Sequence, residues 1–199
     1  MNIKKLTAIA LSIAAAIIIS LNLLSFAASC DNIRSEVLRL HIIANSDSPE
    51  DQSVKIAVRD ALLQEGIKLF SGTIDAEQAE VLLEQNKAEI QDCINKVLRR
   101  HSMSYSANLA LVYEYFDERE YEGFVMPAGK YKAVKITLGE GKGKNWWCVM
   151  FPPLCLPAAT KSDSLEAVFN SKEIKIITKA PRYRIKFKLI EWIEEIRNR

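Results

Sequence analysis

One stretch of eleven residues, 145–155, limits the folds open to this chain more than any other. It reads NWWCVMFPPLC, with two adjacent Trp, a Pro pair and two Cys. Proline cannot donate to a sheet ladder, so we predict a strand over 146–151 that ends at the Pro pair. Neighbouring side chains of a strand point to opposite faces, so we expect either Trp146 or Trp147 in the core and the other at a surface. An exposed Trp is a common binding anchor, so two interpretations stay open: a buried strand, or an aromatic patch that contacts a partner.

The N-terminus has the pattern of a targeting segment. Lys4 and Lys5 precede an uncharged apolar run, 6–28, which ends in small residues. This pattern is typical of a signal peptide. The run is also long enough to cross a bilayer core of about 30 Å, so residues 1–29 are predicted to be a cleaved signal peptide or a retained membrane anchor. The sequence before Cys30 resembles a lipoprotein signal, which makes Cys30 a candidate lipidation site. Each outcome exports the rest of the chain.

The exported part, residues 30–199, has a balanced charge and the length of one domain. The whole chain has 27 Lys and Arg against 25 Asp and Glu, and removing Lys4 and Lys5 leaves 25 of each. Nucleic-acid binders usually have a basic excess, so no nucleic-acid partner is expected. About 170 residues suffice for a proper hydrophobic core, which favours one compact exported domain.

The four Cys do not suggest a metal site. Cys93 falls in a helical pattern, where a small buried thiol is expected. Cys148 and Cys155 are a candidate disulfide, because exported proteins meet an oxidising compartment. No His lies near them and their spacing is not that of a zinc site, so we expect neither a metal nor a cofactor.

The pattern of apolar residues predicts an α+β fold. Branched apolar residues over 36–45 indicate an N-terminal strand. Ser48, followed by Pro and two acids, begins a helix, and Asp75 caps a second, longer helix that extends to Arg100. Both helices have one apolar face. The N-terminal part is therefore predicted as one strand followed by two amphipathic helices.

The second half of the chain is predicted to be a mainly antiparallel sheet followed by a helix. The period changes to two over 108–116 and 131–138, which indicates strands. The Gly-rich segment 139–144 lacks the ending of a nucleotide-binding loop and predicts a flexible hairpin loop into the Trp strand. A short helical piece is expected at 165–169. Helical spacing of apolar residues from about Tyr183 predicts a terminal amphipathic helix, whose basic face contacts either an anionic membrane or solvent.

The sequence contains no recognisable catalytic set. His41 and His101 are the only His, and His41 with Cys148 and Asn45 would supply the residue types of a Cys hydrolase. The sequence around Cys148 does not resemble a nucleophile motif, and no other hydrolase motif is present. We therefore predict no catalytic residues and no enzymatic activity, with the Cys hydrolase as the less favoured alternative.

Three blocks of the sequence resemble one known family. The first is LRLHIIANSDS at 38–48 with VRDA at 58–61. The second runs from PAGKYKA at 127 to the Trp stretch that ends at 155, and the third is KFKLIEW at 186–192. Together they resemble the stage II sporulation protein R family. The central block is too long and too unusual in composition to recur by chance.

The resemblance implies a signalling protein of endospore-forming bacteria. Members of the family are exported from the forespore into the intermembrane space. There they activate a membrane-embedded aspartic protease of the mother cell, which cleaves the precursor of sigma-E. The resemblance thus implies a ligand with a receptor protease as partner and no catalytic activity.

Clustering of aromatic and polar residues suggests where the receptor is contacted. The residues that we expect at this contact are Trp146, Trp147, Phe151, Pro152, Pro153, His41, Asn45 and Asp47. A cell-wall glycan-binding module would also use exposed Trp, and it stays open as the alternative function.

Overall fold

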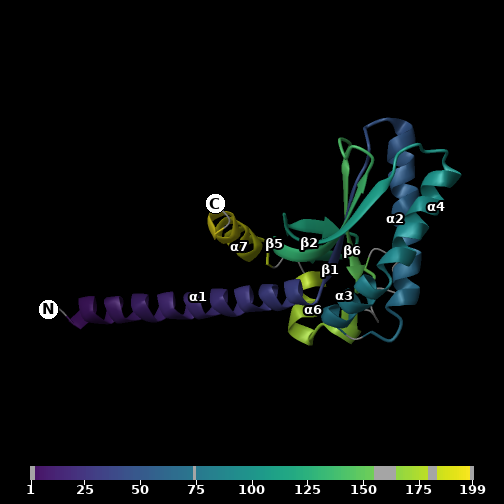
Figure 1. The fold of residues 1–199 in the computed structure, drawn as a ribbon. Helices are drawn as coiled ribbons and strands as arrows, with labels where there is room; N and C mark the ends of the chain where they lie inside the picture. Colours follow the sequence, from purple (N-terminus) through teal and green to yellow (C-terminus); the bar gives the residue numbers. More distant parts are fainter. Residues whose placement is uncertain (1–2, 74, 155–164, 179–182, 198–199) are drawn as a thin grey trace.

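The computed structural model describes residues 3–73, 75–154, 165–178 and 183–197. Its helices and strands are, in chain order, α1 (Ile3–Ser35), β1 (Leu38–Ile43), α2 (Pro49–Leu69), α3 (Ala76–Gln85), α4 (Lys87–Arg100), β2 (Ala107–Phe116), β3 (Arg119–Tyr121), β4 (Phe124–Met126), β5 (Gly129–Leu138), β6 (Asn145–Phe151), α6 (Ser171–Thr178) and α7 (Arg184–Arg197). Residues 165–168 form a further helical turn. The predicted α+β class and the C-terminal helix are confirmed (Figure 1).

β1 lies inside a four-stranded sheet with the order β2-β5-β1-β6. It pairs in parallel with β5 and antiparallel with β6, and β5 pairs antiparallel with β2. The predicted mainly antiparallel sheet is confirmed. β3 and β4 form a separate antiparallel pair that the sequence analysis missed. Each of these strands has three residues, too few to show a period of two.

The Gly-rich segment 139–144 is not the predicted hairpin loop, because β1 lies between β5 and β6. The segment crosses the end of β1 at very short distance. A Cβ atom on Gly143 would lie 2.2 Å from the backbone oxygen of Ser46, and one on Gly139 would lie 2.2 Å from Oδ1 of Asn45. The glycines therefore serve close backbone approach rather than flexibility.

This crossing predicts a large effect of one methyl group. Gly143→Ala should lower the free energy of unfolding by about 2 kcal/mol or more, because the new Cβ meets backbone atoms that cannot rotate away. Gly66→Ala in α2 is the matched control: its Cβ would lie 3.5 Å from Met150, an ordinary contact, and Ala favours the helix. Urea denaturation of both variants checks this. Equal stability of the two variants would contradict it.

The helix starts follow the predicted capping residues. The side chain of Ser48 accepts a hydrogen bond from the backbone of Asp51, and that of Asp75 accepts one from Gln78. The predicted second helix is wrong in one respect, because it is broken at Asn86 into α3 and α4. There the Asn86 side chain donates to the Leu82 carbonyl, a local bond that competes with the helix.

Helix α6 was not predicted, although the sequence carries its start signal. Oδ1 of Asn170 accepts hydrogen bonds from the backbone N–H groups of Lys172 and Glu173, and the Glu173 carboxylate accepts one from the Asn170 backbone. This reciprocal arrangement is a capping box with Asn as the capping residue. The N-x-x-E spacing would have located the helix.

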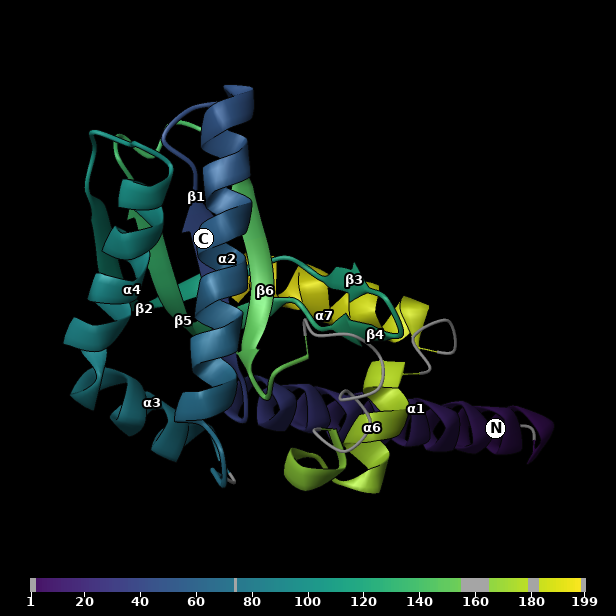
Figure 2. The same ribbon diagram turned by 90° about the vertical axis from the view of Figure 1, so that its right-hand side faces the viewer.

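The two faces of the sheet have separate cores. Helices α2 and α4 lie side by side on one face (Figures 1 and 2), where Leu40 and Ile136 of the sheet pack among Leu62 and Ile94 of the helices. All four are fully buried. Burying a side chain of this kind stabilises a fold by about 1.5–3 kcal/mol. This layer therefore fixes β1 and β5 against the two helices.

The other face is covered by the end of α1 together with α6, α7 and the β3–β4 pair. The apolar helix α1 is long enough to cross a membrane, and most of its apolar run is exposed. α1 continues without a break into the domain, where Phe26, Cys30 and Ile33 are buried. The predicted boundary after residue 29 thus falls inside a helix. Cleavage, retention and lipidation of Cys30 stay predictions, and the Cys30 side chain is fully covered in this structure.

Candidate functional site

The Trp pair lies on β6, an edge strand of the four-stranded sheet. Trp146 points to the α2 face, where its ring lies 4.4 Å from the Arg59 guanidinium. Trp147 points to the α1 face. Both side chains are half-buried, so the expected split into one core and one surface Trp is not found. The two rings instead flank the same sheet edge from opposite sides.

Trp147 stacks on His41 of β1. Their ring centroids are 3.6 Å apart and their ring planes are nearly parallel. The β1–β6 register places the two residues opposite each other. Phe116 meets the Trp147 ring edge-on at 4.8 Å, and the Arg119 guanidinium lies 5.7 Å from it. The Trp147 ring is thus oriented by neighbours on three other strands. A ring held in this way has little rotamer freedom left to lose if a partner contacts it.

His41 is buried and hydrogen-bonded at both ring nitrogens. Nδ1 lies 2.6 Å from a Glu114 carboxylate oxygen, and Nε2 lies 2.9 Å from the Asn145 side chain. The second Glu114 oxygen accepts from Lys135 at 2.9 Å. A histidine with both nitrogens in use has no free nitrogen to act on a substrate. The geometry therefore favours a structural role for His41, which positions Trp147.

Arg39 anchors the same face from the interior. It is fully buried, its Nε donates to the Cys148 carbonyl at 2.9 Å, and its Nη2 donates to the Tyr121 hydroxyl at 2.7 Å. Phe116 and Tyr131 lie within 5.0 Å of the guanidinium carbon. Burial lowers the pKa of Arg39. This residue ties β1, β3 and β6 together behind Trp147.

Asn45 belongs to a polar cluster at the end of β1. The Asp51 carboxylate is the centre of this cluster: it accepts from Asn45 at 2.9 Å, from Ser46 at 2.5 Å and from the Tyr105 hydroxyl at 2.6 Å. Burial alone would raise the pKa of Asp51, but the three hydrogen bonds outweigh burial and lower it. Burial and the bond to Asp51 raise the pKa of Tyr105.

The same cluster fastens the Gly-rich segment. Oδ1 of Asn45 accepts from the backbone of Glu140, and Oδ1 of Asp47 accepts from the backbone of Lys144. Lys55 of α2 donates to the Lys144 carbonyl at 2.9 Å. These contacts give Asn45 and Asp47 a structural task, since they hold the loop that leads into β6.

The cluster predicts a specific dependence of stability on pH. The lowered pKa of Asp51 means that its ionised form stabilises the fold at neutral pH, and that this contribution disappears as the pH falls through the folded-state pKa. Asp51→Asn should cost about 1–3 kcal/mol at pH 7, because donors lose a charged acceptor. The difference from the unmodified chain should shrink below about pH 4. Thermal denaturation across pH measures this difference. The control is Asp60→Asn, because Asp60 is an exposed residue in an ion pair with Arg59. A constant difference at all pH values would contradict this account.

The remaining predicted contact residues lie at the other end of β6. Phe151 is buried and packs edge-on against Phe70, the residue that follows α2, with ring centroids 5.7 Å apart. Pro152 is buried and Pro153 is half-buried. The structure therefore does not gather the eight predicted residues into one patch. They lie in four separate places: the stack of His41 on Trp147, the Trp146 side chain, the Asn45 cluster, and the end of β6 at Phe151.

The cysteines do not form a hydrolase site with His41. Cys148 is disulfide-bonded and buried. It lies opposite Leu40 on the α2 face, whereas His41 points to the α1 face. The Cys hydrolase alternative fails on this geometry. Cys155 lies outside the described residues, so its pairing with Cys148 stays a prediction. Cys93 is a half-buried free thiol rather than a fully buried one.

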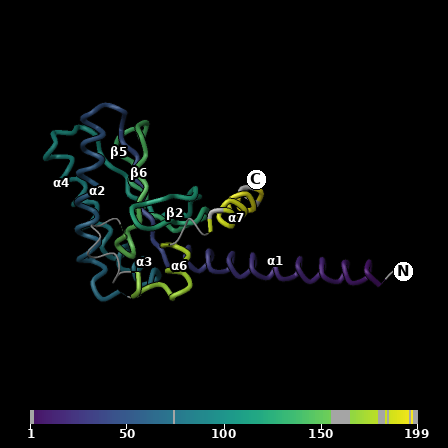
Figure 3. The backbone as a smooth tube through the Cα atoms, turned by 180° about the vertical axis from the view of Figure 1, so that it is seen from behind, coloured from purple at the N-terminus to yellow at the C-terminus, as the bar shows by residue number. Residues whose placement is uncertain are grey.

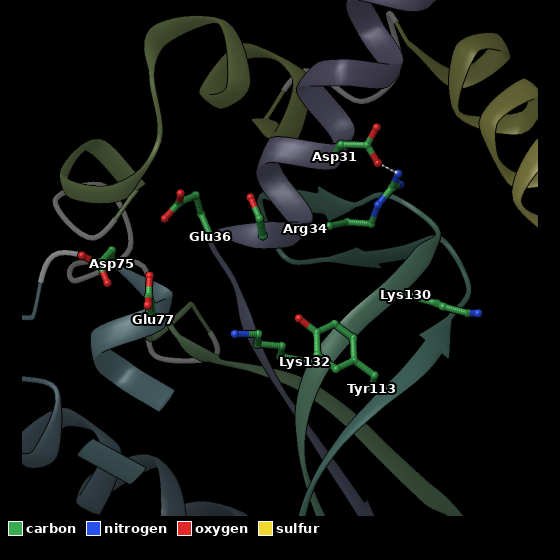
Figure 4. A pocket seen from close by; sticks show the side chains of 9 residues that line it. Asp31, Arg34, Glu36, Asp75, Glu77, Tyr113, Lys130 and Lys132 are labelled. Carbon is green, nitrogen blue, oxygen red and sulfur yellow. Dashed lines mark hydrogen bonds and ion pairs between the residues drawn. The ribbon is translucent and has the colours of Figure 1, made fainter. Parts of the chain in front are cut away.

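A pocket of about 580 Å³ lies where α1 ends and α3 begins. Figure 4 shows Glu36, Asp75 and Glu77 on one side and Lys132 of β5 facing them, while Lys130 points away. Burial, and then the Asp75 and Glu173 carboxylates, raise the pKa of Glu36. Among the described residues no group of His, Cys, Asp or Glu could hold a metal ion. The pocket is therefore a polar hollow of mixed charge rather than a metal site.

Comparison with known proteins decides the family. The model of the family "Stage II sporulation protein R (spore_II_R)" matches residues 34–161, more than half of the chain. This chain belongs to the stage II sporulation protein R family. The matched segment begins in the last turn of α1 and includes the whole sheet. The family resemblance that the sequence blocks predicted is confirmed, although its third block, 186–192, lies beyond the matched segment.

One curated relative is stage II sporulation protein R of Bacillus subtilis (strain 168). It is 29% identical to this chain over 185 aligned positions, and the match covers 82% of this chain and 83% of the relative. No solved structure matches the chain significantly. Membership of the family gives this protein a role in sporulation.

Residues that position the Trp147 ring were missed by the sequence analysis. Glu114, Asn145 and Arg119 come from β2, β6 and β3, and they meet only because the sheet order brings these strands together. For Arg39 the sequence held one signal, since a charged residue inside an otherwise apolar strand is seldom buried without partners for its charged group. The strand order itself is not encoded in local periodicity.

Proposed function

We propose that this protein is an exported signalling ligand of sporulation. In this proposal the forespore exports it into the intermembrane space, where it activates a membrane-embedded aspartic protease of the mother cell. The activated protease then cleaves the precursor of sigma-E. The observation that carries the proposal is the family membership over residues 34–161.

Two features of the chain support export. α1 contains an apolar run that can cross a membrane, and Lys4 and Lys5 precede it. Basic residues favour the side of the membrane on which the protein is made. The domain is therefore expected on the far side, whether α1 is retained or cleaved.

We propose that the receptor contacts the β6 edge. Trp146 and Trp147 flank this edge from both sides, and both residues are half-buried. An edge strand can accept a further strand from a partner, with side chains on both faces adding specificity. Asn145 is exposed at the start of the same strand. A partner that pairs with β6 would touch both Trp rings and Asn145.

Replacing the Bacillus subtilis relative by this chain in sporulating cells tests this function. A Bacillus subtilis strain without its stage II sporulation protein R and without the receptor protease would receive this chain together with the protease from the same genome. Processing of the sigma-E precursor, followed by immunoblot, should depend on both added genes. Processing that is absent, although both proteins are made and this chain is exported, would contradict the proposal.

A further inference from the structure

Helix α7 has apolar residues on two opposite faces. Phe187 and Ile190 are buried against the domain, as is Glu194. The opposite face consists of exposed large apolar side chains, which are Ile185, Leu189, Trp192, Ile193 and Ile196. Their spacing of three and four residues places them on one stripe. Trp192 is 60% exposed and Ile185 is 80% exposed. None of the described parts of the chain covers this stripe.

A stripe of this size needs an apolar partner. Single exposed apolar residues are ordinary, but contiguous ones mark an interaction site. The flanks of the stripe are polar, since Lys186 and Lys188 lie on either side of it. Lys188 forms an ion pair with Glu191 one turn on. Such a helix has the composition of one that lies in a membrane interface, with Trp and Ile inward and Lys at the headgroups.

The position of α7 on α1 places this stripe beside the membrane. Phe26 of α1 stacks on Tyr183 at 5.5 Å and meets Phe187 edge-on at 5.3 Å between ring centroids. Arg34 of α1 lies 3.5 Å from Glu194. Figures 1 and 3 show α7 beside the domain end of α1 from front and back. α7 is thus fixed to the part of α1 that directly follows the exposed apolar run.

The part of the apolar run that stays outside the domain, which ends before Phe26, sets the membrane level. Residues 6–24 form about 28 Å of helix, enough to cross the hydrocarbon core. Leu24 is still exposed, and Phe26 is the first buried residue of α1. Two residues advance a helix by about 3 Å, so the contact of Phe26 with α7 lies at the headgroup level.

We propose that α7 lies on the lipid bilayer, with Trp192 and the apolar stripe among the acyl chains and its lysines at anionic phosphates. The proposal takes α1 as a retained membrane anchor, and it does not depend on the signalling function, because it uses only α1 and α7. It also lies outside the segment that matches the family, which ends at residue 161. Its consequence is that the membrane holds the domain at two places, which fixes the direction in which the sheet faces.

Fluorescence quenching by lipid tests this proposal on the full chain. The protein is reconstituted into vesicles of phosphatidylcholine and phosphatidylglycerol, with or without bromine atoms on the upper part of the acyl chains. The chain has three Trp, so Trp192→Phe leaves only Trp146 and Trp147. In brominated vesicles the fluorescence of Trp192 should be quenched, so the emission of the unmodified chain and of the Trp147→Phe variant should be lower than in vesicles without bromine. The emission of the Trp192→Phe variant should be the same in both kinds of vesicle.

The outcomes separate lipid from other partners of the stripe. Quenching that requires Trp192 supports the proposal. Equal emission with and without bromine in all variants overturns it, and then the stripe faces water, a second copy or another protein. Because Trp192 is an exposed side chain, its replacement by Phe should not unfold the domain, and circular dichroism of the variant checks this.

Discussion

Trp147→Ala is expected to reduce activation of the receptor protease by roughly thirtyfold or more. Anchors of this kind contribute about 2 kcal/mol or more to association, which corresponds to that factor. Trp147 is oriented by its stack on His41 and by Phe116, so its ring is prepared for contact. Trp146→Ala should act in the same direction, because both rings flank the β6 edge. Concentration dependence of precursor cleavage measures the effect.

The control for this experiment lies at the other edge of the sheet. Tyr113 is an exposed aromatic residue on β2, the edge strand opposite β6. Tyr113→Ala should leave activation unchanged. Thermal denaturation must show that each Trp variant is folded, since both rings are half-buried. A folded Trp147→Ala and a folded Trp146→Ala that activate like the unmodified chain would contradict the proposed contact at β6.

Removal of the domain end of α1 should destabilise the protein strongly. Phe26, Cys30 and Ile33 are buried in the second core, together with Arg34. Loss of Phe26 and Ile33 alone removes two side chains, each of which contributes about 1.5–3 kcal/mol on burial. A chain of residues 36–199 should therefore be at least about 3 kcal/mol less stable than one of residues 25–199. Both lack residues 1–24, which include all the exposed large apolar residues of α1, so the comparison isolates the packing.

Urea denaturation of these two chains gives the answer. Residues 25–199 should unfold cooperatively, and residues 36–199 should unfold at much lower urea concentration or be unfolded in buffer. Equal midpoints would show that α1 is only a leader. This result also bears on processing: cleavage after residue 29 would remove Phe26 and with it the contact with Tyr183 and Phe187.

Local signals predicted the elements of the fold well. The caps at Ser48 and Asp75, the strands over 108–116 and 131–138 and the terminal helix all depend on near neighbours in sequence. These signals failed where a partner far along the chain decides. The Gly-rich segment looked like a hairpin loop, because nothing within it shows that β1 passes beneath it.

The candidate site was predictable only in part. The Trp pair stood out by composition, and its strand was located correctly. The hypothesis that Asn45 and Asp47 belong to the same contact was based on clustering in the sequence. In the structure both residues hold the Gly-rich loop. Phe151 belongs to the core because a register shift between β1 and β6 brings it to the α2 face. Side-chain direction at a bulge cannot be deduced from alternation.

Reconstitution of cleavage tests the central claim most directly. Vesicles would contain the receptor protease from the same genome and its sigma-E precursor, and the chain would be added as residues 25–199, which keep the buried end of α1. The account predicts that cleavage depends on the added domain, saturates with its concentration, and is lost with Trp147→Ala but not with Tyr113→Ala. Cleavage by the protease alone at the same rate, or no cleavage with a folded domain and a protease shown to be competent, would contradict it.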